Sequence, residues 1–196
     1  MTRVSLWLLV FLAGVVAARA AAIQGVVTCL GCTDYSNAVI YAEKIPKEPV
    51  IPAKEPVVLD QINLTFVPHV LAVVVGTTVS FPNSDEVRHN VFSPSPAKRF
   101  NLGTYPRGTA RRITFDKPGE VDLLCNVHLE MSAYVLALET PYFVVTPKDG
   151  NFLLKELSPG KYTVTAWHEK FKSVAHPVEI KGNETIRLNF SLTTRR

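Results

Sequence analysis

Four residues in the middle of the chain carry the side chains of a soft metal site. Cys125, His128 and Met131 occur together in the segment Cys-Asn-Val-His-Leu-Glu-Met, and His89 lies well before them in the sequence. Two imidazoles, one thiolate and one thioether form the ligand set of a mononuclear blue-copper site, because the sulfur ligands stabilise Cu(I) and imidazole suits both oxidation states. The sequence therefore predicts one type 1 copper ion bound by His89, Cys125, His128 and Met131.

Two other interpretations of these residues are weaker. A tetrahedral zinc site also uses cysteine and histidine, but methionine is a poor zinc ligand. Without a metal, Cys125 would be a small buried hydrophobe, Met131 would fill the core and the histidines would lie on the surface. This last interpretation requires the soft ligands of the chain to occur together by coincidence, so copper is favoured.

The other two cysteines occur in the segment Cys29-Leu30-Gly31-Cys32. In an oxidising compartment this spacing favours a structural disulfide between Cys29 and Cys32 across a tight turn. A redox-active dithiol is the alternative, but it needs a helix N-terminus to lower the pKa of its thiol, and these residues lie among predicted strands. Haem attachment requires a histidine after the second cysteine, where the chain has Thr33. With this pair assigned, Cys125 is the thiol left for a metal.

Residues 1–20 have the features of a secretory signal peptide. A basic start is followed by an apolar run at residues 4–18 and by Ala-Arg-Ala at residues 18–20, an Ala-x-Ala cleavage site. The run is short for a bilayer span, which requires about 20 residues. We therefore expect a periplasmic or secreted protein with no membrane span in its mature form. With 21 Lys+Arg, 17 Asp+Glu and scattered basic residues, the composition gives no reason to expect a nucleic-acid partner.

The elements that must position the ligands are predicted to be β-strands. Apolar and polar residues alternate along nearly the whole chain, as in residues 121–125, 161–167 and 184–190, and turn segments separate these runs. Short strands at this spacing favour β-sandwiches or Greek-key barrels. Prolines break the pattern in residues 44–56, which are predicted to be an extended Pro-rich connector.

The block at residues 57–141 resembles the cupredoxins. Phe-Pro-Asn-Ser-Asp at residues 81–85 and His-Asn-Val-Phe at 89–92 are similar to the strand that bears the first histidine ligand in that family. The short C-x2-H-x2-M loop is similar to that of the amicyanin-like members, and the block as a whole resembles plastocyanin-like proteins of the methylamine utilisation type. The resemblance implies a cupredoxin Greek-key β-sandwich that binds copper through the four residues named above.

The same resemblance implies roles for residues around the metal. Asn90 would brace the ligand loop beside the thiolate. Plastocyanins have a tyrosine directly before the cysteine, whereas this chain has Leu124. Electrons are therefore expected to enter at an exposed edge of His128 rather than through that position.

The flanks resemble a second kind of β-sandwich, the carboxypeptidase regulatory-like (transthyretin-like) domains. Residues 23–27 and 37–41 are similar to its opening strands, and the rest of the pattern follows residue 141. The resemblance implies one sandwich formed by residues 23–43 together with 142–193, with the copper domain inserted into one of its loops. The alternative is a tandem arrangement in which the N-terminal strands join the copper domain. The fold class expected is all-β, with two sandwiches.

The remaining polar residues are assigned structural roles. His69 is expected to be a surface or packing histidine, while Trp167 and His168 could contact the copper domain at an interface. Acidic residues are expected to be solvated in turns and on strand faces; they are Asp85, Glu86, Asp116, Glu120 and Asp122. No nucleophilic triad, phosphate-binding loop or pair of catalytic carboxylates is evident in the sequence, and four protein ligands would leave no open position for a substrate, so an enzyme is not expected.

The function expected from these features is that of an exported one-electron carrier. Its partners would be redox proteins, such as a c-type cytochrome or a periplasmic dehydrogenase. The alternative is a copper-binding or delivery protein in which the metal is cargo and has no redox role. A third possibility is a protein whose flanking sandwich binds a partner, with copper of secondary importance.

Overall fold

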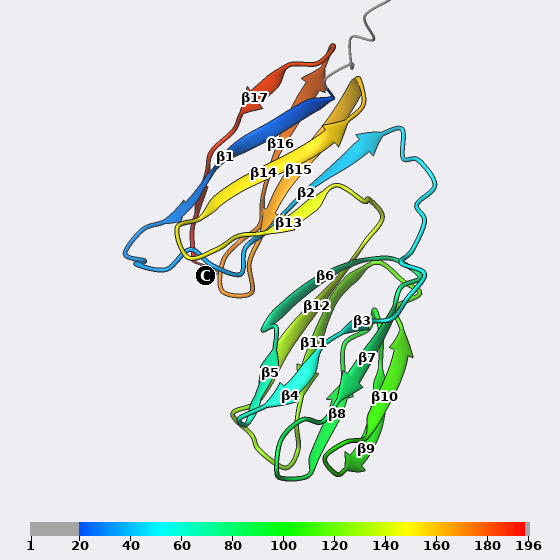
Figure 1. Ribbon diagram of the computed structural model, residues 1–196. Helices are drawn as coiled ribbons and strands as arrows, with labels where there is room; N and C mark the ends of the chain where they lie inside the picture. Colours follow the sequence, from blue (N-terminus) through cyan, green and yellow to red (C-terminus); the bar gives the residue numbers. More distant parts are fainter. Residues whose placement is uncertain (1–19, 195–196) are drawn as a thin grey trace, which may run out of the picture.

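The computed structural model describes residues 20–194, which form 18 β-strands and no helix (Figure 1). The all-β fold class predicted from the sequence is confirmed. The predicted signal peptide, residues 1–20, lies outside the described residues except for Ala20. A helix long and apolar enough to cross a membrane is not found in residues 20–194.

Strands from both ends of the chain form one β-sandwich, here called the flanking sandwich (Figure 1). In its first sheet, β1 (Ala21–Cys29) pairs with β14 (Asn151–Leu157), β17 (Thr185–Arg187) and β18 (Phe190–Leu192). Its second sheet has the order β13-β2-β15-β16, with bounds Phe143–Val145, Val39–Ile45, Gly160–Trp167 and Val174–Ile180. The first two strands of the chain are thus hydrogen-bonded to strands that follow residue 142.

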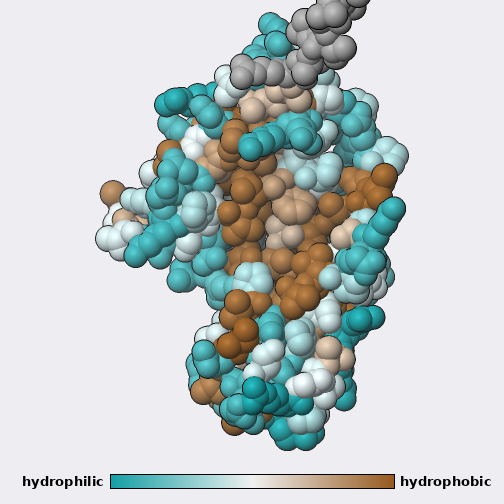
Figure 2. All heavy atoms as spheres, in the orientation of Figure 1, coloured by the Kyte–Doolittle hydropathy of each residue, from teal (hydrophilic) through white to brown (hydrophobic). Residues whose placement is uncertain are grey.

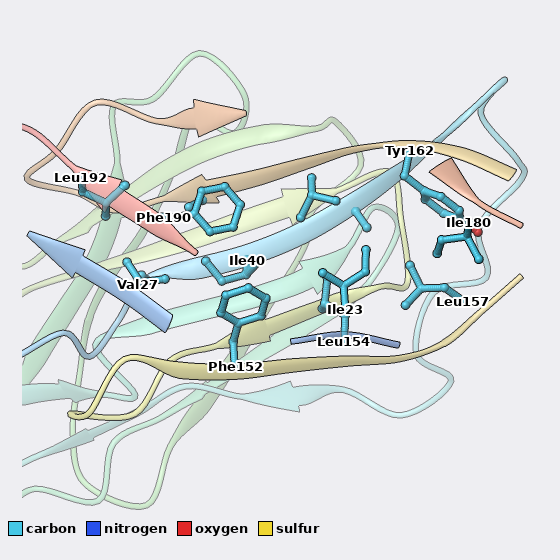
Figure 3. Packing of buried hydrophobic residues seen from close by; sticks show 14 of the residues in the cluster. Ile23, Val27, Ile40, Phe152, Leu154, Leu157, Tyr162, Ile180, Phe190 and Leu192 are labelled. Carbon is cyan, nitrogen blue, oxygen red and sulfur yellow. The ribbon is translucent and has the colours of Figure 1, made fainter. Parts of the chain in front are cut away.

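The two sheets of the flanking sandwich close on an apolar core because alternate residues of each strand point inward. Figure 3 shows side chains from β1, β2, β14, β15 and β18 directed toward one another across this core. Ile23, Ile40 and Val164 are completely buried there, and Phe152 packs against Phe190 with ring centroids 5.9 Å apart. The contact between Phe152 and Phe190 joins two strands of the same sheet that come from distant parts of the sequence.

The residues between β2 and β13 form a second unit, here called the central sandwich. Its larger sheet has the order β6-β12-β11-β8-β9, with bounds Val70–Val74, Ser132–Leu138, Gly119–Leu124, His89–Ser93 and Phe100–Tyr105. A smaller sheet has the order β10-β7-β3, with bounds Ala110–Thr114, Thr78–Pro82 and Val57–Val58. A hairpin of β4 (Asp60–Ile62) and β5 (Thr65–Val67) completes it. Buried aromatic and aliphatic side chains, including Phe81, Phe115, Val121 and Leu123, fill the space between the sheets.

The chain passes between the sandwiches twice, and the two passages lie side by side. Strand β2 extends to Ile45, so the predicted connector 44–56 begins in a strand, and residues 46–56 contain none. The returning segment is hydrogen-bonded to the outgoing one, because Thr140 Oγ1 donates to the Ala42 carbonyl at 2.5 Å and the Ala42 amide donates to the Tyr142 carbonyl at 2.9 Å. Lys47 also pairs with Glu139.

A third apolar cluster, here called the interface cluster, joins the outer faces of the two sandwiches. The flanking sandwich contributes Val39, Tyr41, Phe143, Val145 and Trp167, and the central sandwich contributes Val70, Ala72, Tyr134, Leu136 and Leu138. Figure 2 shows apolar surface over the middle of the molecule, down to where the sandwiches meet.

Trp167 is the largest side chain of this cluster and also makes a polar contact across it. It is only 5% exposed, and its Nε1 donates to Glu120 Oε2 on β11 at 3.0 Å. The prediction that Trp167 could contact the copper domain at an interface is confirmed. The prediction that Glu120 is solvated is wrong, because its carboxylate is the acceptor for this indole.

Replacing Trp167 tests how much the two sandwiches stabilise each other. Trp167→Ala should lower the free energy of unfolding by about 3 kcal/mol, because it removes a large buried side chain. Trp167→Phe should cost about 1 kcal/mol, because it keeps most of the apolar contact and loses the hydrogen bond to Glu120. Urea unfolding followed by circular dichroism measures both values. Equal stabilities of wild type and Trp167→Ala would show that the interface contributes nothing to folding.

Candidate metal centre

The predicted ligand loop is held at both ends by a pair of antiparallel strands. Strand β11 ends at Leu124 and β12 begins at Ser132, and these two residues are paired in the ladder. The loop between them therefore contains Cys125, His128 and Met131, closed at its base by backbone hydrogen bonds. Within the loop the Met131 amide donates to the His128 carbonyl at 3.1 Å, which turns the chain back toward β12.

His89 reaches the same place from another strand. It is the first residue of β8, which pairs with β11 through Phe92 and Leu124. The ring nitrogens of His89 and His128 and the sulfur of Cys125 all lie within 4.8 Å of one another. His89 is completely buried, Cys125 is buried and His128 is half-buried. In residues 20–194 no other group of three such side chains comes together in this way.

The two imidazoles face each other through the same ring atom. His89 Nδ1 and His128 Nδ1 are 3.0 Å apart, and the ring centroids are 4.8 Å apart at an interplanar angle of 63°. Each Nδ1 has one lone pair or one hydrogen, so without a metal one ring must donate to the other. A metal ion held by both residues would accept a lone pair from each Nδ1 instead. With the buried free thiol of Cys125 beside them, this donor set fits a thiophilic metal such as copper.

Met131 lies in the same core as Cys125. Its side chain is 1% exposed and packs in the central-sandwich cluster that includes Cys125. It is thus a buried thioether in the loop that supplies two of the three converging residues.

The structure adds Asp85 to the surroundings of the site. Asp85 Oδ2 lies 3.0 Å from His89 Nε2 and also accepts a hydrogen bond from the Leu64 amide at 2.7 Å. The hydrogen bond from Leu64 lowers the pKa of Asp85 most, and the bond from His89 lowers it next. The carboxyl is therefore ionised at neutral pH. An ionised carboxylate accepts only, so His89 Nε2 carries the hydrogen and Nδ1 is free to bind. The prediction that Asp85 is merely solvated is wrong.

A buried polar network holds the turn that carries Asp85. Asn83 Nδ2 donates to the carbonyls of Val87 at 2.9 Å and Tyr105 at 3.1 Å, and Asn83 Oδ1 accepts from the Asp85 amide at 3.0 Å. The Tyr105 hydroxyl donates to the Phe81 carbonyl at 3.0 Å. Burial raises the pKa of Tyr105 to about 12, so this hydroxyl keeps its hydrogen at neutral pH. The network fixes the turn at residues 83–87, which leads into His89.

Asn90, predicted to brace the ligand loop, is buried beside the site on β8. Its Nδ2 donates to Asn101 Oδ1 at 2.9 Å, which ties β8 to β9. Its Oδ1 is buried and has no hydrogen-bond partner in the described residues. The hydrogen bond of this side chain thus goes to the neighbouring strand rather than to the loop.

Exposed apolar side chains lie in the loops that carry His128 and lead to His89. Val127 and Leu129, on either side of it in the loop, are 46% and 86% exposed. Val87, in the turn before His89, and Leu64, whose amide binds Asp85, are also exposed. The loops that form the site therefore present apolar groups to solvent.

The other two cysteines are joined to each other. Cys29 and Cys32 form a disulfide at the end of β1, with their Cα atoms 5.5 Å apart. The turn that it closes places Leu30 almost fully in solvent. Cys125 is the free cysteine of the chain.

Removing the Asp85 carboxylate should destabilise the metal-free protein. Asp85→Ala leaves the buried His89 Nε2 without its acceptor, and we expect the free energy of unfolding to fall by about 2 kcal/mol at pH 7. Because the folded-state pKa of Asp85 is lowered, this difference should persist above pH 5 and disappear as the carboxyl is protonated in acid. Urea unfolding of wild type and variant between pH 3 and pH 7 provides the measurement.

Glu86→Ala is the matched control for this experiment. Glu86 is the next carboxylate in the same turn, but it is largely exposed and pairs with Arg107 at the surface. Exposed ion pairs contribute little, so this variant should unfold almost like the wild type. If both variants lower the free energy of unfolding equally, the contact between Asp85 and His89 does not stabilise the protein more than an exposed ion pair does.

Comparison with known proteins gives partial structural matches. No known sequence family and no curated protein matches the chain. Among solved structures, a purple cupredoxin from Nitrosopumilus maritimus is 23% identical, with a TM-score of 0.39 over 42% of this chain and 99% of its own. A reduced amicyanin variant is 22% identical, with a TM-score of 0.41 over 52% of this chain and 99% of its own. A Cu-containing nitrite reductase from Thermus scotoductus is 25% identical, with a TM-score of 0.42 over 58% of this chain and 28% of its own.

By their names, these neighbours are a cupredoxin, an amicyanin and a copper-containing nitrite reductase.

Proposed function

We propose that this protein is a type 1 copper protein that carries one electron between redox partners. The observation that supports the proposal is the convergence of His89, Cys125 and His128 within 4.8 Å around the facing Nδ1 atoms. Copper bound there would supply a Cu(II)/Cu(I) couple. Met131, buried in the same loop, would complete the set as the weak axial ligand.

The chain's own residues prepare the site for both oxidation states. Asp85 holds His89 in the tautomer whose Nδ1 is free, and the β11–β12 ladder fixes the base of the loop that bears Cys125, His128 and Met131. Burial of Cys125 and His89 excludes water from that side of the site. Four protein ligands leave no open position for a substrate, which favours a carrier over an enzyme.

The surface around His128 supports contact with a protein partner. His128 is the half-buried member of the set, and Val127 and Leu129 beside it are exposed apolar groups. A redox protein such as a c-type cytochrome or a periplasmic dehydrogenase would dock here, with the edge of His128 as the point where electrons pass. The Cys29–Cys32 disulfide supports a location outside the cytoplasm, in the periplasm or secreted.

The absorption spectrum of the copper-loaded protein tests the ligand set. Cu(II) added to the wild-type protein should produce an intense thiolate-to-copper band in the visible range, and Cys125→Ser should abolish it. The double variant Cys29→Ser/Cys32→Ser is the control and should keep the band, because those sulfurs belong to the disulfide. A colourless copper complex of the wild type would contradict the proposal. A coloured complex that lacks a reversible redox couple but passes Cu(I) to an acceptor would favour copper delivery instead.

A second variant tests the docking surface. Leu129→Asp places a charge on the apolar surface next to His128, so reduction of the copper protein by a c-type cytochrome should slow by about tenfold, within the range seen for interface variants. The absorption band should be unchanged. Leu30→Asp, at an even more exposed leucine of the flanking sandwich, is the control and should leave the rate as it is. Equal rates for Leu129→Asp and wild type would place docking elsewhere.

A further inference from the structure

His69 makes contacts on both sides of the boundary between the two sandwiches. It lies between β5 and β6 of the central sandwich. Its Nδ1 is 3.2 Å from the Ser132 carbonyl oxygen, and its Nε2 is 3.1 Å from Glu169 Oε2. Glu169 belongs to the turn between β15 and β16 of the flanking sandwich, which lies beside β6 in Figure 1. The sequence-based expectation of a surface or packing histidine overlooked this bridge.

The two acceptors of His69 determine its protonation state. A backbone carbonyl only accepts hydrogen bonds, and an ionised carboxylate does the same. Both contacts can therefore exist together only when both ring nitrogens carry a hydrogen, that is, when His69 is an imidazolium ion. The Glu169 carboxylate raises the pKa of His69 through this hydrogen bond. Burial acts to raise the pKa of Glu169, but the bond from His69 and the nearby positive charges lower it overall.

The Ser132 carbonyl is next to the predicted axial ligand. Ser132 directly follows Met131 and begins β12. The Tyr134 amide donates to the His69 carbonyl at 2.9 Å, so His69 holds the start of β12 through its backbone as well as its ring. The His69 and Tyr134 rings also meet edge to face, with centroids 5.6 Å apart. The exit of the ligand loop is thus attached to His69 at two residues, Ser132 and Tyr134.

The contact with Glu169 is sheltered by the flanking sandwich. The Glu169 side chain is only 7% exposed, whereas that of His69 is 36% exposed. Two other titratable groups act on the pair: Lys170 Nζ lies 3.8 Å from Glu169 Oε1, and His168 lowers the pKa of Glu169 when it is protonated. Next to this pair, Tyr134 packs on Trp167 with centroids 6.0 Å apart, so the bridge lies at the edge of the interface cluster.

We propose that His69 is a positioning residue through which the flanking sandwich, by way of Glu169, fixes the backbone beside Met131 and so the placement of its sulfur. Loss of the Glu169 carboxylate frees His69 to lose a proton. A neutral ring carries a single hydrogen, and when that hydrogen is on Nε2 the Nδ1 atom cannot donate to the Ser132 carbonyl. This role of His69 rests on the proposed function, in which Met131 is a copper ligand.

Nuclear magnetic resonance of the metal-free protein tests this role directly. The chain has two methionines, Met1 and Met131, so methyl labelling of methionine gives a simple spectrum in which Met131 can be followed. In the wild type the Met131 methyl resonance should shift as pH rises through the raised pKa of His69, in step with the His69 ring signals. In Glu169→Gln this shift should occur at lower pH. Glu179→Gln removes an exposed carboxylate of the same sandwich and should behave like the wild type.

Three results would overturn the positioning role. In Glu169→Gln and His69→Gln, the Met131 methyl resonance could stay at its wild-type place at every pH, although the charged pair is gone. In the wild type, the Met131 methyl resonance could stay constant over the pH range in which the His69 ring signals shift. This test needs no variant, so it remains valid if a variant does not fold. Finally, the ring signals could show that His69 is neutral while it still contacts both Ser132 and Glu169.

The copper-loaded protein gives an independent readout. If Met131 binds copper, Glu169→Gln should change the visible absorption and the electron paramagnetic resonance spectrum. It should also weaken Cu(I) binding by about tenfold, the lower end of what outer-sphere partners of metal ligands contribute. Unchanged spectra and affinity in a copper-binding wild type would reject the positioning role and leave the proposed function intact. A wild type without the thiolate band would reject the proposed function, while the metal-free measurements would still decide whether His69 positions Met131.

Discussion

The facing Nδ1 atoms of His89 and His128 are the contact on which the rest of this site depends. His89 begins β8 and His128 lies in the loop between β11 and β12, and their nitrogens meet at 3.0 Å in a place closed to water on one side. Such a contact requires that β8 and the loop after β11 keep a fixed register, because a slip by one residue would turn His89 to the opposite face. The pairing of Phe92 with Leu124, the turn network around Asn83 and the Asp85 carboxylate all fix that register.

Much of this arrangement could be predicted from the sequence, because it depends on local patterns. The alternation of apolar residues predicted strands, and the soft side chains in Cys125–Met131 with His89 predicted which residues would converge. His89, Cys125 and His128 do converge, although the ion itself remains a prediction. The contact of Trp167 with the central block was also anticipated from the sequence.

What the sequence did not predict are contacts made by ordinary polar residues. Asp85 looked like one acidic turn residue among several, and only the turn geometry places its carboxylate on His89. The sequence did contain one signal for this contact, because Asp85 lies in a turn four positions before a predicted histidine ligand. No pattern of this kind links His69 to Glu169, which are 100 residues apart and meet only because the two sandwiches pack on each other. Glu120 was misjudged for the same reason, since its partner Trp167 comes from the other sandwich.

The pairing of β1 with β17 and β18 has a consequence for the order in which the molecule can assemble. Strand β1 ends at Cys29, and β17 and β18 begin more than 150 residues later, whereas all four predicted ligands fall between residues 89 and 131. Contacts between distant segments form late, because closing a long loop costs entropy before any contact repays it. During synthesis from the N-terminus the central sandwich can therefore fold, and bring its donor atoms together, before the strands that pair with β1 and β2 have been made. The last strands to arrive then close the flanking sandwich against a site that is already built.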